Sequence, residues 1–307
     1  MPIQIQKERR HPEWLKIKLP SGENYIKVRN LVKTNRLHTI CEEAKCPNLS
    51  ECWSHGTATF LILGDTCTRW CGYCNVKTGK PSQSNPEEPE MVADAVRKMG
   101  LKYVVVTSVT RDDLADGGAS IFAETVRQIK KQAPDCSVEL LIPDFKLMTG
   151  KVLREGELNI DALRTVIDAK PDVLAHNIEA VRRVFTRVRP GGNYDVSLRL
   201  LAKIKEINSK MPTKSSIILG FDETLDELKQ TMVELRQNNV DFLTLGQYLQ
   251  PSVKHVKIEK YYTPEEFKVL EKIGYEFGFK HVEAGPLVRS SYRADKLNAI
   301  INQAAQC

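Results

Sequence analysis

Six of the eight cysteines in this chain lie between residues 41 and 74, in two sets of three with different spacings. The first set is Cys41-x4-Cys46-x5-Cys52, and the second is Cys67-x3-Cys71-x2-Cys74. A structural zinc site closes with four protein ligands, so sets of three suit zinc poorly. An iron–sulfur cluster held by three thiolates leaves one iron open to another ligand. The spacings therefore predict two iron–sulfur clusters, with zinc sites as the alternative.

The composition is that of a soluble globular enzyme, with 41% hydrophobic and 27% charged residues in a chain of 307. No apolar run reaches the roughly 18 residues of a spanning helix, and residues 1–10 lack the apolar core of a secretory signal. We therefore expect a cytoplasmic location and no membrane partner. In a reducing compartment, clustered cysteines indicate metal or redox chemistry rather than disulfides.

The net charge of +6 is dispersed along the chain, and no block of five like charges is present. Dispersed charge favours an ordinary solvated surface with a slight basic bias over a nucleic-acid-binding stripe. No nucleic-acid partner is expected. An acidic protein partner fits the same bias.

The elements that must position the cysteines alternate between two kinds. Six short apolar runs have the length of buried strands, at residues 57–63, 102–107, 137–142, 171–175, 215–220 and 241–245. Segments with helical spacing of apolar residues lie between them, at residues 91–99, 120–129, 198–207 and 225–235. Alternating strands and helices predict parallel strands with right-handed crossovers, and continuous hydrophobicity predicts that both sheet faces are covered.

Six strand–helix units are fewer than the eight of a closed barrel, so the pattern predicts an α/β fold with a partial (β/α)6 barrel of the TIM type. A doubly wound open sheet is the alternative. We divide the chain into an N-terminal extension with the first triplet (1–56), a barrel core (57–250) and a C-terminal segment (251–307). The apolar stretch at 280–284 and a helix after Ser291 are expected as an appendage in this last segment.

The second triplet directly follows the first predicted strand, and residues at the carboxyl ends of parallel strands line the active-site face of such folds. This spacing, with the aromatic Tyr73 before the last cysteine, resembles the radical S-adenosylmethionine (SAM) superfamily. The resemblance implies that Cys67, Cys71 and Cys74 hold a [4Fe-4S] cluster whose open iron binds the amino and carboxylate groups of S-adenosyl-L-methionine. It also implies reductive cleavage to methionine and a 5′-deoxyadenosyl radical that abstracts hydrogen.

The first triplet, together with residues 289–292 (Arg-Ser-Ser-Tyr), is similar to the lipoyl synthase family, and the similarity extends from residue 11 to residue 294. It implies that Cys41, Cys46, Cys52 and a serine hold an auxiliary [4Fe-4S] cluster. We favour Ser291 over Ser290. The implied activity is a sulfurtransferase reaction, in which this cluster gives two sulfur atoms to C6 and C8 of a protein-bound octanoyl-lysine. A serine oxygen binds iron less well than thiolate, which suits a cluster that must come apart. Alternatively, the serines cap the last helix.

The same resemblance implies three kinds of partner. The substrate carrier would be an octanoylated lipoyl carrier domain or the glycine cleavage H protein. Electrons would come from ferredoxin or flavodoxin, and an iron–sulfur carrier would rebuild the auxiliary cluster. Two rival interpretations are a methylthiotransferase, although no appended RNA-binding module is apparent, and a zinc-stapled nucleic-acid-binding protein.

Tyr73, within the second triplet, and several residues further along the chain are expected to bind the cosubstrate. Gly117 and Gly118 follow the second strand and resemble the superfamily's glycine motif for the methionine amino group; the alternative is a simple turn. Arg189, before a Pro-Gly-Gly sequence, would hold a carboxylate or lie in solvent.

Thr107, Glu139 and Asn177 lie at or near the ends of predicted strands, where polar side chains reach a barrel mouth. A carboxylate inside an apolar strand is costly unless it is paired, so Glu139 is expected to contact a ribose or amine, or to form an internal ion pair. His176 beside Asn177 is either a site residue or a hydrogen-bonded core histidine.

One stretch departs from the family pattern. Where the lipoyl synthase family usually has a Leu-Gly-Leu-Gly-Glu turn, residues 219–223 of this chain are Leu-Gly-Phe-Asp-Glu. Phe221 and Asp222 are the substituted positions.

Overall fold

A computed structural model describes residues 11–16, 22–35, 37–54, 58–149, 152–292 and 297. Its main sheet has eight strands in the order β1-β2-β5-β6-β9-β10-β11-β12. The strands are β1 (His38–Thr39), β2 (Thr59–Ile62), β5 (Tyr103–Ser108), β6 (Ser137–Leu141), β9 (Val173–Ala175), β10 (Thr213–Leu219), β11 (Phe242–Gln247) and β12 (His281–Gly285). All neighbouring pairs from β2 to β12 are parallel, and only β1 pairs antiparallel.

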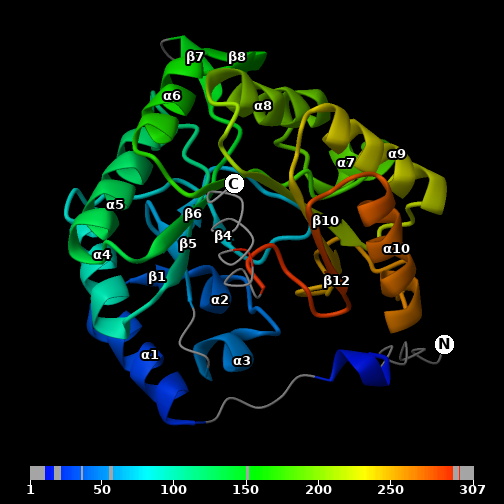
Figure 1. Ribbon diagram of the computed structural model, residues 1–307, viewed down its shortest axis with the longest axis horizontal. Helices are drawn as coiled ribbons and strands as arrows, with labels where there is room; N and C mark the ends of the chain where they lie inside the picture. The colour runs from blue at the N-terminus through cyan, green and yellow to red at the C-terminus, as the bar shows by residue number, and fades with distance from the viewer. Residues whose placement is uncertain are drawn as a thin grey trace, which may run out of the picture.

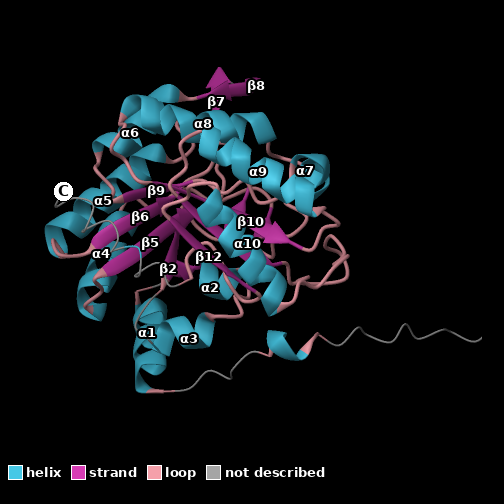
Figure 2. Ribbon diagram, turned by 45° about the vertical axis from the view of Figure 1, so that its right-hand side comes forward, coloured by secondary structure: helices cyan, strands magenta, loops and turns pink. Residues whose placement is uncertain are grey.

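Helices surround this sheet on the outside, so that Figure 1 shows the strands inside an arc of helices. They include α4 (Glu88–Met99), α5 (Ala119–Gln132), α6 (Ile160–Asp168), α7 (Arg182–Val188), α8 (Tyr194–Ile207), α9 (Leu225–Gln237) and α10 (Pro264–Glu276). Figure 2, turned by 45°, shows the strands fanning out beneath them. The sheet does not close, since β1 and β12 are its two edges. The partial barrel of the TIM type is therefore confirmed.

The apolar stretch at 280–284 is not the appendage that we expected. It forms β12, which pairs in parallel with β11 from Phe242↔His281 to Gly246↔Gly285. Helix α10 supplies the crossover, and its Thr263–Glu266 capping box fixes its start. The barrel thus has seven parallel strands, and the sheet continues past residue 250. The proposed division at residues 56 and 250 stays a prediction.

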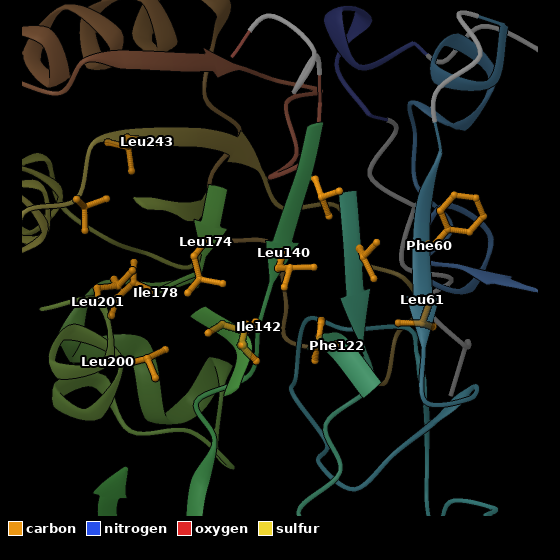
Figure 3. Packing of buried hydrophobic residues seen from close by; sticks show 14 of the residues in the cluster. Phe60, Leu61, Phe122, Leu140, Ile142, Leu174, Ile178, Leu200, Leu201 and Leu243 are labelled. Carbon is orange, nitrogen blue, oxygen red and sulfur yellow. The ribbon is translucent and has the colours of Figure 1, made fainter. Parts of the chain in front are cut away.

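The core lies between the strands and the helical layer. Figure 3 shows Leu140 of β6 and Leu174 of β9 among the buried side chains, with Phe122 of α5 and Leu200 and Leu201 of α8. Successive residues of a strand point to opposite faces, so Val138 and Leu140 share one face while Glu139 lies on the other. Figure 3 also labels Phe60 and Leu61 of β2 and Leu243 of β11 in this cluster. Continuous apolar runs of this kind are typical of strands in a sheet that is covered on both faces.

The N-terminal extension packs against one edge of the barrel. Its elements are the short helix η1 (Glu13–Leu15), α1 (Glu23–Thr34), α2 (Ile40–Glu43) and α3 (Leu49–Ser54). Tyr25 of α1 meets Trp53 of α3 with ring centroids 5.4 Å apart. Strand β1 fastens the extension to the sheet through the pairs His38↔Leu61 and Thr39↔Phe60.

Two small sheets lie outside the main one. Strands β3 (Thr66–Cys67) and β4 (Lys77–Thr78) flank the second triplet, and β7 (Lys146–Thr149) and β8 (Val152–Leu158) form a hairpin. The sequence did not predict this hairpin. None of the described helices is long and apolar enough to cross a membrane. The expected helix at residues 294–304 lies, apart from residue 297, outside the described residues.

Candidate active site

A cavity of about 310 Å³ lies at the carboxyl ends of the strands and brings three distant parts of the chain together. Its wall includes cysteines of the first triplet, all three cysteines of the second, and the C-terminal serine pair. The lining side chains that the sequence predicted are Cys41, Cys46, Cys67, Cys71, Tyr73, Cys74, Thr107, Asn177, Arg189, Ser290 and Ser291. Cys41 and Cys46 of the first triplet and all three thiols of the second therefore face one cavity, which the linear sequence could not show.

The loop of the second triplet, residues 67–74, is held by backbone hydrogen bonds to several other segments. Its Thr68 N–H donates to the Thr110 carbonyl at 3.0 Å, and the Gly72 N–H donates to the Val188 carbonyl at 2.8 Å. The Gly72 carbonyl in turn accepts from the Val256 N–H at 2.8 Å. A β-carbon on Gly72 would lie 2.6 Å from the Val256 side chain, so glycine is needed there for close approach.

Two backbone donors face the first thiol of this loop. The N–H groups of Arg69 and Thr110 lie 3.4 and 3.3 Å from Cys67 Sγ. Hydrogen bonds to sulfur stabilise a thiolate and tune an iron–sulfur cluster. The local fold thus directs two backbone donors at the Cys67 sulfur.

The first triplet is shaped by short-range contacts. The Thr39 hydroxyl accepts from the Glu42 N–H and caps α2, which carries Cys41. The Cys46 N–H donates to the Cys41 carbonyl at 3.0 Å, and the Cys52 N–H donates to the Asn48 carbonyl at 2.8 Å. Cys52 itself is half-buried on α3 and is not among the residues that line the cavity.

The C-terminal segment reaches the first triplet through two side-chain hydrogen bonds. Asn48 Nδ2 donates to the Leu287 carbonyl at 2.6 Å, and the Tyr292 hydroxyl donates to Glu51 Oε1 at 3.0 Å. These contacts lie on either side of the serine pair, which they hold at the cavity wall. A third bond, from Asn75 Nδ2 to the Glu43 carbonyl at 2.9 Å, joins the two triplet segments.

Burial shifts the acidity of these thiols upward. Burial, with a smaller contribution from Cys46, raises the pKa of Cys41 to about 12, and burial raises the pKa of Cys74 to about 12 and of Cys71 to about 11. Metal binding displaces the proton, because thiolate is the ligand form. Burial lowers the pKa of Arg289, whose cation is favoured by Cys46. That cation suits an anionic set of ligands.

The cavity also contains buried polar atoms that no described residue satisfies. Ser108 Oγ, Asn177 Oδ1 and Tyr248 OH line it without a hydrogen-bond partner among the described residues. Such groups are costly unless a ligand or water bonds them. No three Cys, His, Asp or Glu side chains within the described ranges converge on a site for a single metal ion. The unsatisfied polar atoms fit a polar cosubstrate in the cavity.

Four of the predicted cosubstrate residues, Tyr73, Thr107, Asn177 and Arg189, line the cavity. Thr107 donates from its hydroxyl to the Leu141 carbonyl at 3.0 Å. Arg189 is buried and donates to the Asn177 carbonyl at 2.9 Å. No carboxylate within the described residues forms an ion pair with Arg189. Asn177 donates to Glu179 Oε1 at 3.1 Å.

Glu139, Gly117 and Gly118 do not line the cavity. Glu139 accepts from Lys214 Nζ at 2.8 Å and from the Tyr103 hydroxyl at 2.6 Å, so the internal ion pair is the correct alternative. A β-carbon on Gly118 would lie 2.2 Å from Leu63, and one on Gly117 would lie 3.0 Å from Phe145. The structure therefore shows both glycines in close packing at the start of α5. His176 is a hydrogen-bonded, wholly buried histidine, although it borders the cavity.

Tyr248 and Arg69 are site residues that the sequence analysis missed. Tyr248 follows β11 and packs on Phe221, with ring centroids 4.4 Å apart. Its position just after a strand end was the available signal. Arg69 stands inside the second triplet and pairs with two carboxylates. Nothing in the sequence marks which carboxylates these are.

Comparison with known proteins gives consistent matches. Residues 61–235 match the model of the radical SAM superfamily, and residues 2–46 match the N-terminal domain of lipoyl synthase of the radical SAM family. The chain is 50% identical to a lipoyl synthase of Shouchella clausii over 99% of this chain and 95% of that protein. It is 55% identical to one of Bacillus cytotoxicus over 94% and 93% of the two chains.

Solved structures show the same fold at low sequence identity. Methylornithine synthase (PylB) superposes with a TM-score of 0.55 at 12% identity, covering 84% of this chain and 74% of that one. HydG, a maturase of the [FeFe]-hydrogenase, superposes with a TM-score of 0.54 at 12% identity, covering 85% and 57%. These two likenesses concern the fold alone.

Proposed function

Since the chain belongs to the lipoyl synthase family of the radical SAM superfamily, we propose that its shared chamber inserts two sulfur atoms into a protein-bound octanoyl chain. The reaction places one sulfur at C6 and one at C8 of octanoyl-lysine. The observation that carries this proposal is that two thiols of the first triplet, all three thiols of the second and the C-terminal serine pair meet at one cavity. A radical and a sulfur donor must reach the same carbon, and separate pockets would prevent that.

We assign Cys67, Cys71 and Cys74 to the [4Fe-4S] cluster that binds SAM. When bound, this cluster and SAM supply the radical that removes hydrogen from the octanoyl chain. The two N–H groups at Cys67 stabilise its thiolate. The cation of Arg189 suits the carboxylate of SAM, because it is buried and otherwise bonded to a carbonyl. Thr107, Tyr73 and the unsatisfied Asn177 Oδ1 are its proposed polar neighbours.

We assign Cys41, Cys46 and Cys52 to the auxiliary [4Fe-4S] cluster and Ser291 to its fourth position. Two hydrogen bonds support the assignment of the serine. The Asn48–Leu287 and Tyr292–Glu51 bonds hold the segment that contains the serine pair against the first triplet. Arg289 contributes a positive charge beside Cys46. We keep Ser291 as the proposed ligand in preference to Ser290, and the two single variants below distinguish them.

The substrate implied by the family is a lipoyl carrier protein. As finer proposals, we name an octanoylated lipoyl domain or the glycine cleavage H protein as carrier, ferredoxin or flavodoxin as electron donor, and an iron–sulfur carrier that rebuilds the auxiliary cluster. We also propose a cytoplasmic location, because the thiols must stay reduced. The net charge of +6 would steer an acidic carrier, an effect that salt should weaken.

Mass spectrometry of an octanoylated peptide tests the reaction. The peptide is incubated anaerobically with reconstituted enzyme, SAM and reductant, and two added sulfur atoms are expected. Ser291→Ala should retain SAM cleavage and lose most sulfur insertion, whereas the matched Ser290→Ala should retain both. A peptide that gains no sulfur with a fully loaded enzyme would refute the proposal.

Metal analysis separates this function from the zinc alternative. Oxygen-free preparations should contain about eight irons per chain, as two four-iron clusters require. A colourless protein that contains zinc would contradict both cluster assignments.

A further inference from the structure

A buried network of three charged side chains lies behind the loop of the second triplet. Arg69 stands between Cys67 and Cys71, and its side chain is 4% exposed. Asp112 follows β5, and Asp144 follows β6 and is wholly buried. The three groups therefore belong to three different strand-to-helix connections that meet at the cavity end of the barrel.

The geometry of this network is doubly bidentate. Arg69 Nε and Nη2 donate to the two oxygens of Asp112, both at 2.7 Å. Arg69 Nη1 and Nη2 donate to the two oxygens of Asp144 at 2.9 and 2.6 Å. Only a planar guanidinium can bind two carboxylates in this way, since lysine offers a single point charge.

The surroundings fix the arginine further. A β-carbon on Gly191 would lie 3.0 Å from Arg69 Cδ, so the glycine packs closely on the aliphatic part of the side chain. Thr68 Oγ1 donates to the Thr110 carbonyl at 2.9 Å and accepts from the Asp112 N–H at 3.1 Å. Burial would raise the pKa of Asp144, but the Arg69 charge outweighs it and holds that pKa well below its usual range.

We propose that Arg69 is a positioning residue that fixes Cys67 and Cys71 for the radical-generating cluster by clamping their loop to Asp112 and Asp144. The clamp acts on the loop before any cluster is bound. It holds the ends of β5 and β6 against the thiol loop, and it keeps the Arg69 and Thr110 N–H groups directed at Cys67 Sγ. The inference rests on the proposed function only in assigning these thiols to that cluster.

Thiol labelling of the metal-free protein tests the clamp directly. The alkylation rates of Cys67 and Cys71 are measured anaerobically by peptide mass spectrometry, with the buried Cys136 as internal reference. In Arg69→Lys both rates should rise about tenfold, the effect of losing charged hydrogen bonds on a local opening. The Cys136 rate should stay within about twofold. Asp112→Asn, which leaves Asp144 paired, should give a smaller rise at the same two thiols.

Asp241→Asn is the matched control. Asp241 is also a buried carboxylate held by two cations, Lys205 at 2.5 Å and Lys280 at 2.8 Å, but it stands just before β11 at the opposite end of the barrel. This variant should lower the melting temperature without changing the rates at Cys67 and Cys71. If it raises those rates as much as Arg69→Lys does, the arginine has only a general stabilising role and the proposal fails.

A second measurement uses the reconstituted protein. In Arg69→Lys the electron paramagnetic resonance signal of the reduced cluster should change only at higher SAM concentrations than in the unaltered protein. The kcat for SAM cleavage should fall by a larger factor than the KM for SAM rises. Labelling rates and spectra equal to those of the unaltered protein would overturn the clamp. Absence of sulfur insertion alone would count against the proposed function and not against the clamp. Should Arg69→Lys fail to fold, Asp112→Asn decides the same question.

Discussion

The loop at residues 67–74 and the segment at residues 41–52 each carry three thiols, but the protein fastens them differently. The first is bonded to the connections after β5 and β6, to the end of α7 and to residue 256, and its arginine is doubly ion-paired. The second is stabilised by backbone bonds within itself and by side-chain bonds to residues 75, 287 and 292, and it directly follows β1, which joins the sheet through two residue pairs. Its contact with the serine pair depends on a few side chains.

This contrast matches the two roles that we propose. A cluster that works in every turnover gains from a rigid frame, because preorganised geometry lowers the cost of each reaction. A cluster that gives up its sulfur must be dismantled and rebuilt, so its ligands need a segment that can open at a low free-energy cost. The contacts of residues 287–292 would be the part that is released.

The largest effects should come from removing one cysteine ligand from each triplet. Cys71→Ala should abolish both SAM cleavage and sulfur insertion, because the radical precedes sulfur transfer. Cys46→Ala should abolish sulfur insertion and leave SAM cleavage within about threefold, since its cluster is not the one that binds SAM. Production of 5′-deoxyadenosine and of the sulfur-containing peptide are measured in parallel. Full lipoyl formation by Cys46→Ala would contradict the donor role.

Weakening the contacts of the C-terminal segment should give an intermediate effect. Tyr292→Phe removes the hydroxyl that donates to Glu51, and Asn48→Ala removes the donor to Leu287. Each should lower the rate of sulfur insertion about tenfold, as second-layer contacts at metal sites do, with SAM cleavage unchanged.

Tyr275→Phe on α10 is the control for that measurement, because it removes a hydroxyl bonded to His281 far along the chain from both triplets. It should change neither rate. Equal losses in Tyr292→Phe and Tyr275→Phe would indicate a general effect on stability rather than a specific hold on the serine pair.

The rigid side of the chamber should show a pH dependence through His176. Its Nδ1 lies 2.9 Å from the Ile142 carbonyl and its Nε2 lies 3.0 Å from Ser197 Oγ. Burial, together with the Arg189 charge, lowers its pKa to about 3. The unfolded chain therefore binds the proton first, and the folded protein loses stability as the pH falls below about 6.5.

Urea unfolding of the metal-free protein measures this loss. Between pH 7 and pH 5 the free energy of unfolding should fall by about 2 kcal/mol on account of His176. His176→Asn should have a correspondingly flatter profile over the same range. Parallel profiles for the two proteins would show that His176 does not control this dependence.

The smallest effect should come from Asp222, where the lipoyl synthase family usually has glycine. Asp222 has φ of +78°, in the left-handed region that disfavours a side chain. Asp222→Gly should raise the free energy of unfolding by about 0.5–1 kcal/mol and leave the rates of SAM cleavage and sulfur insertion unchanged. Asp222→Ala, which keeps a β-carbon and loses the polar side chain, should lower it; thermal unfolding compares the two. A rise in both would contradict the role of the backbone angle.

Most of the barrel could be predicted because buried parallel strands have continuous apolar sequences. The six predicted runs correspond to β2, β5, β6, β9, β10 and β11, with ends that differ by a few residues. The seventh, β12, was recognised as an apolar stretch but assigned to an appendage, because only six strand–helix units were assigned to the barrel. It is an edge strand with a partner on one side only.

The cosubstrate residues were predicted less well, because the residues that they contact lie far away in the sequence. Glu139 is paired with Lys214, which lies 75 residues further along the chain, and no local pattern marks that partnership. The glycines at 117 and 118 have the positive φ that a turn requires, but only the fold shows Leu63 and Phe145 beside them. Tyr248 follows a strand end, but only the fold shows that its hydroxyl is buried without a hydrogen-bond partner among the described residues.

The sequence by itself determined the ligand chemistry and the class of fold, because cysteine spacing and hydrophobic period are local properties of the chain. Only the tertiary structure decided that residues 41, 71 and 291 share one chamber, and that Arg69 is anchored by Asp112 and Asp144. These relations depend on packing between segments tens to hundreds of residues apart. Parallel strand order sets such contacts, and no short stretch of sequence contains them.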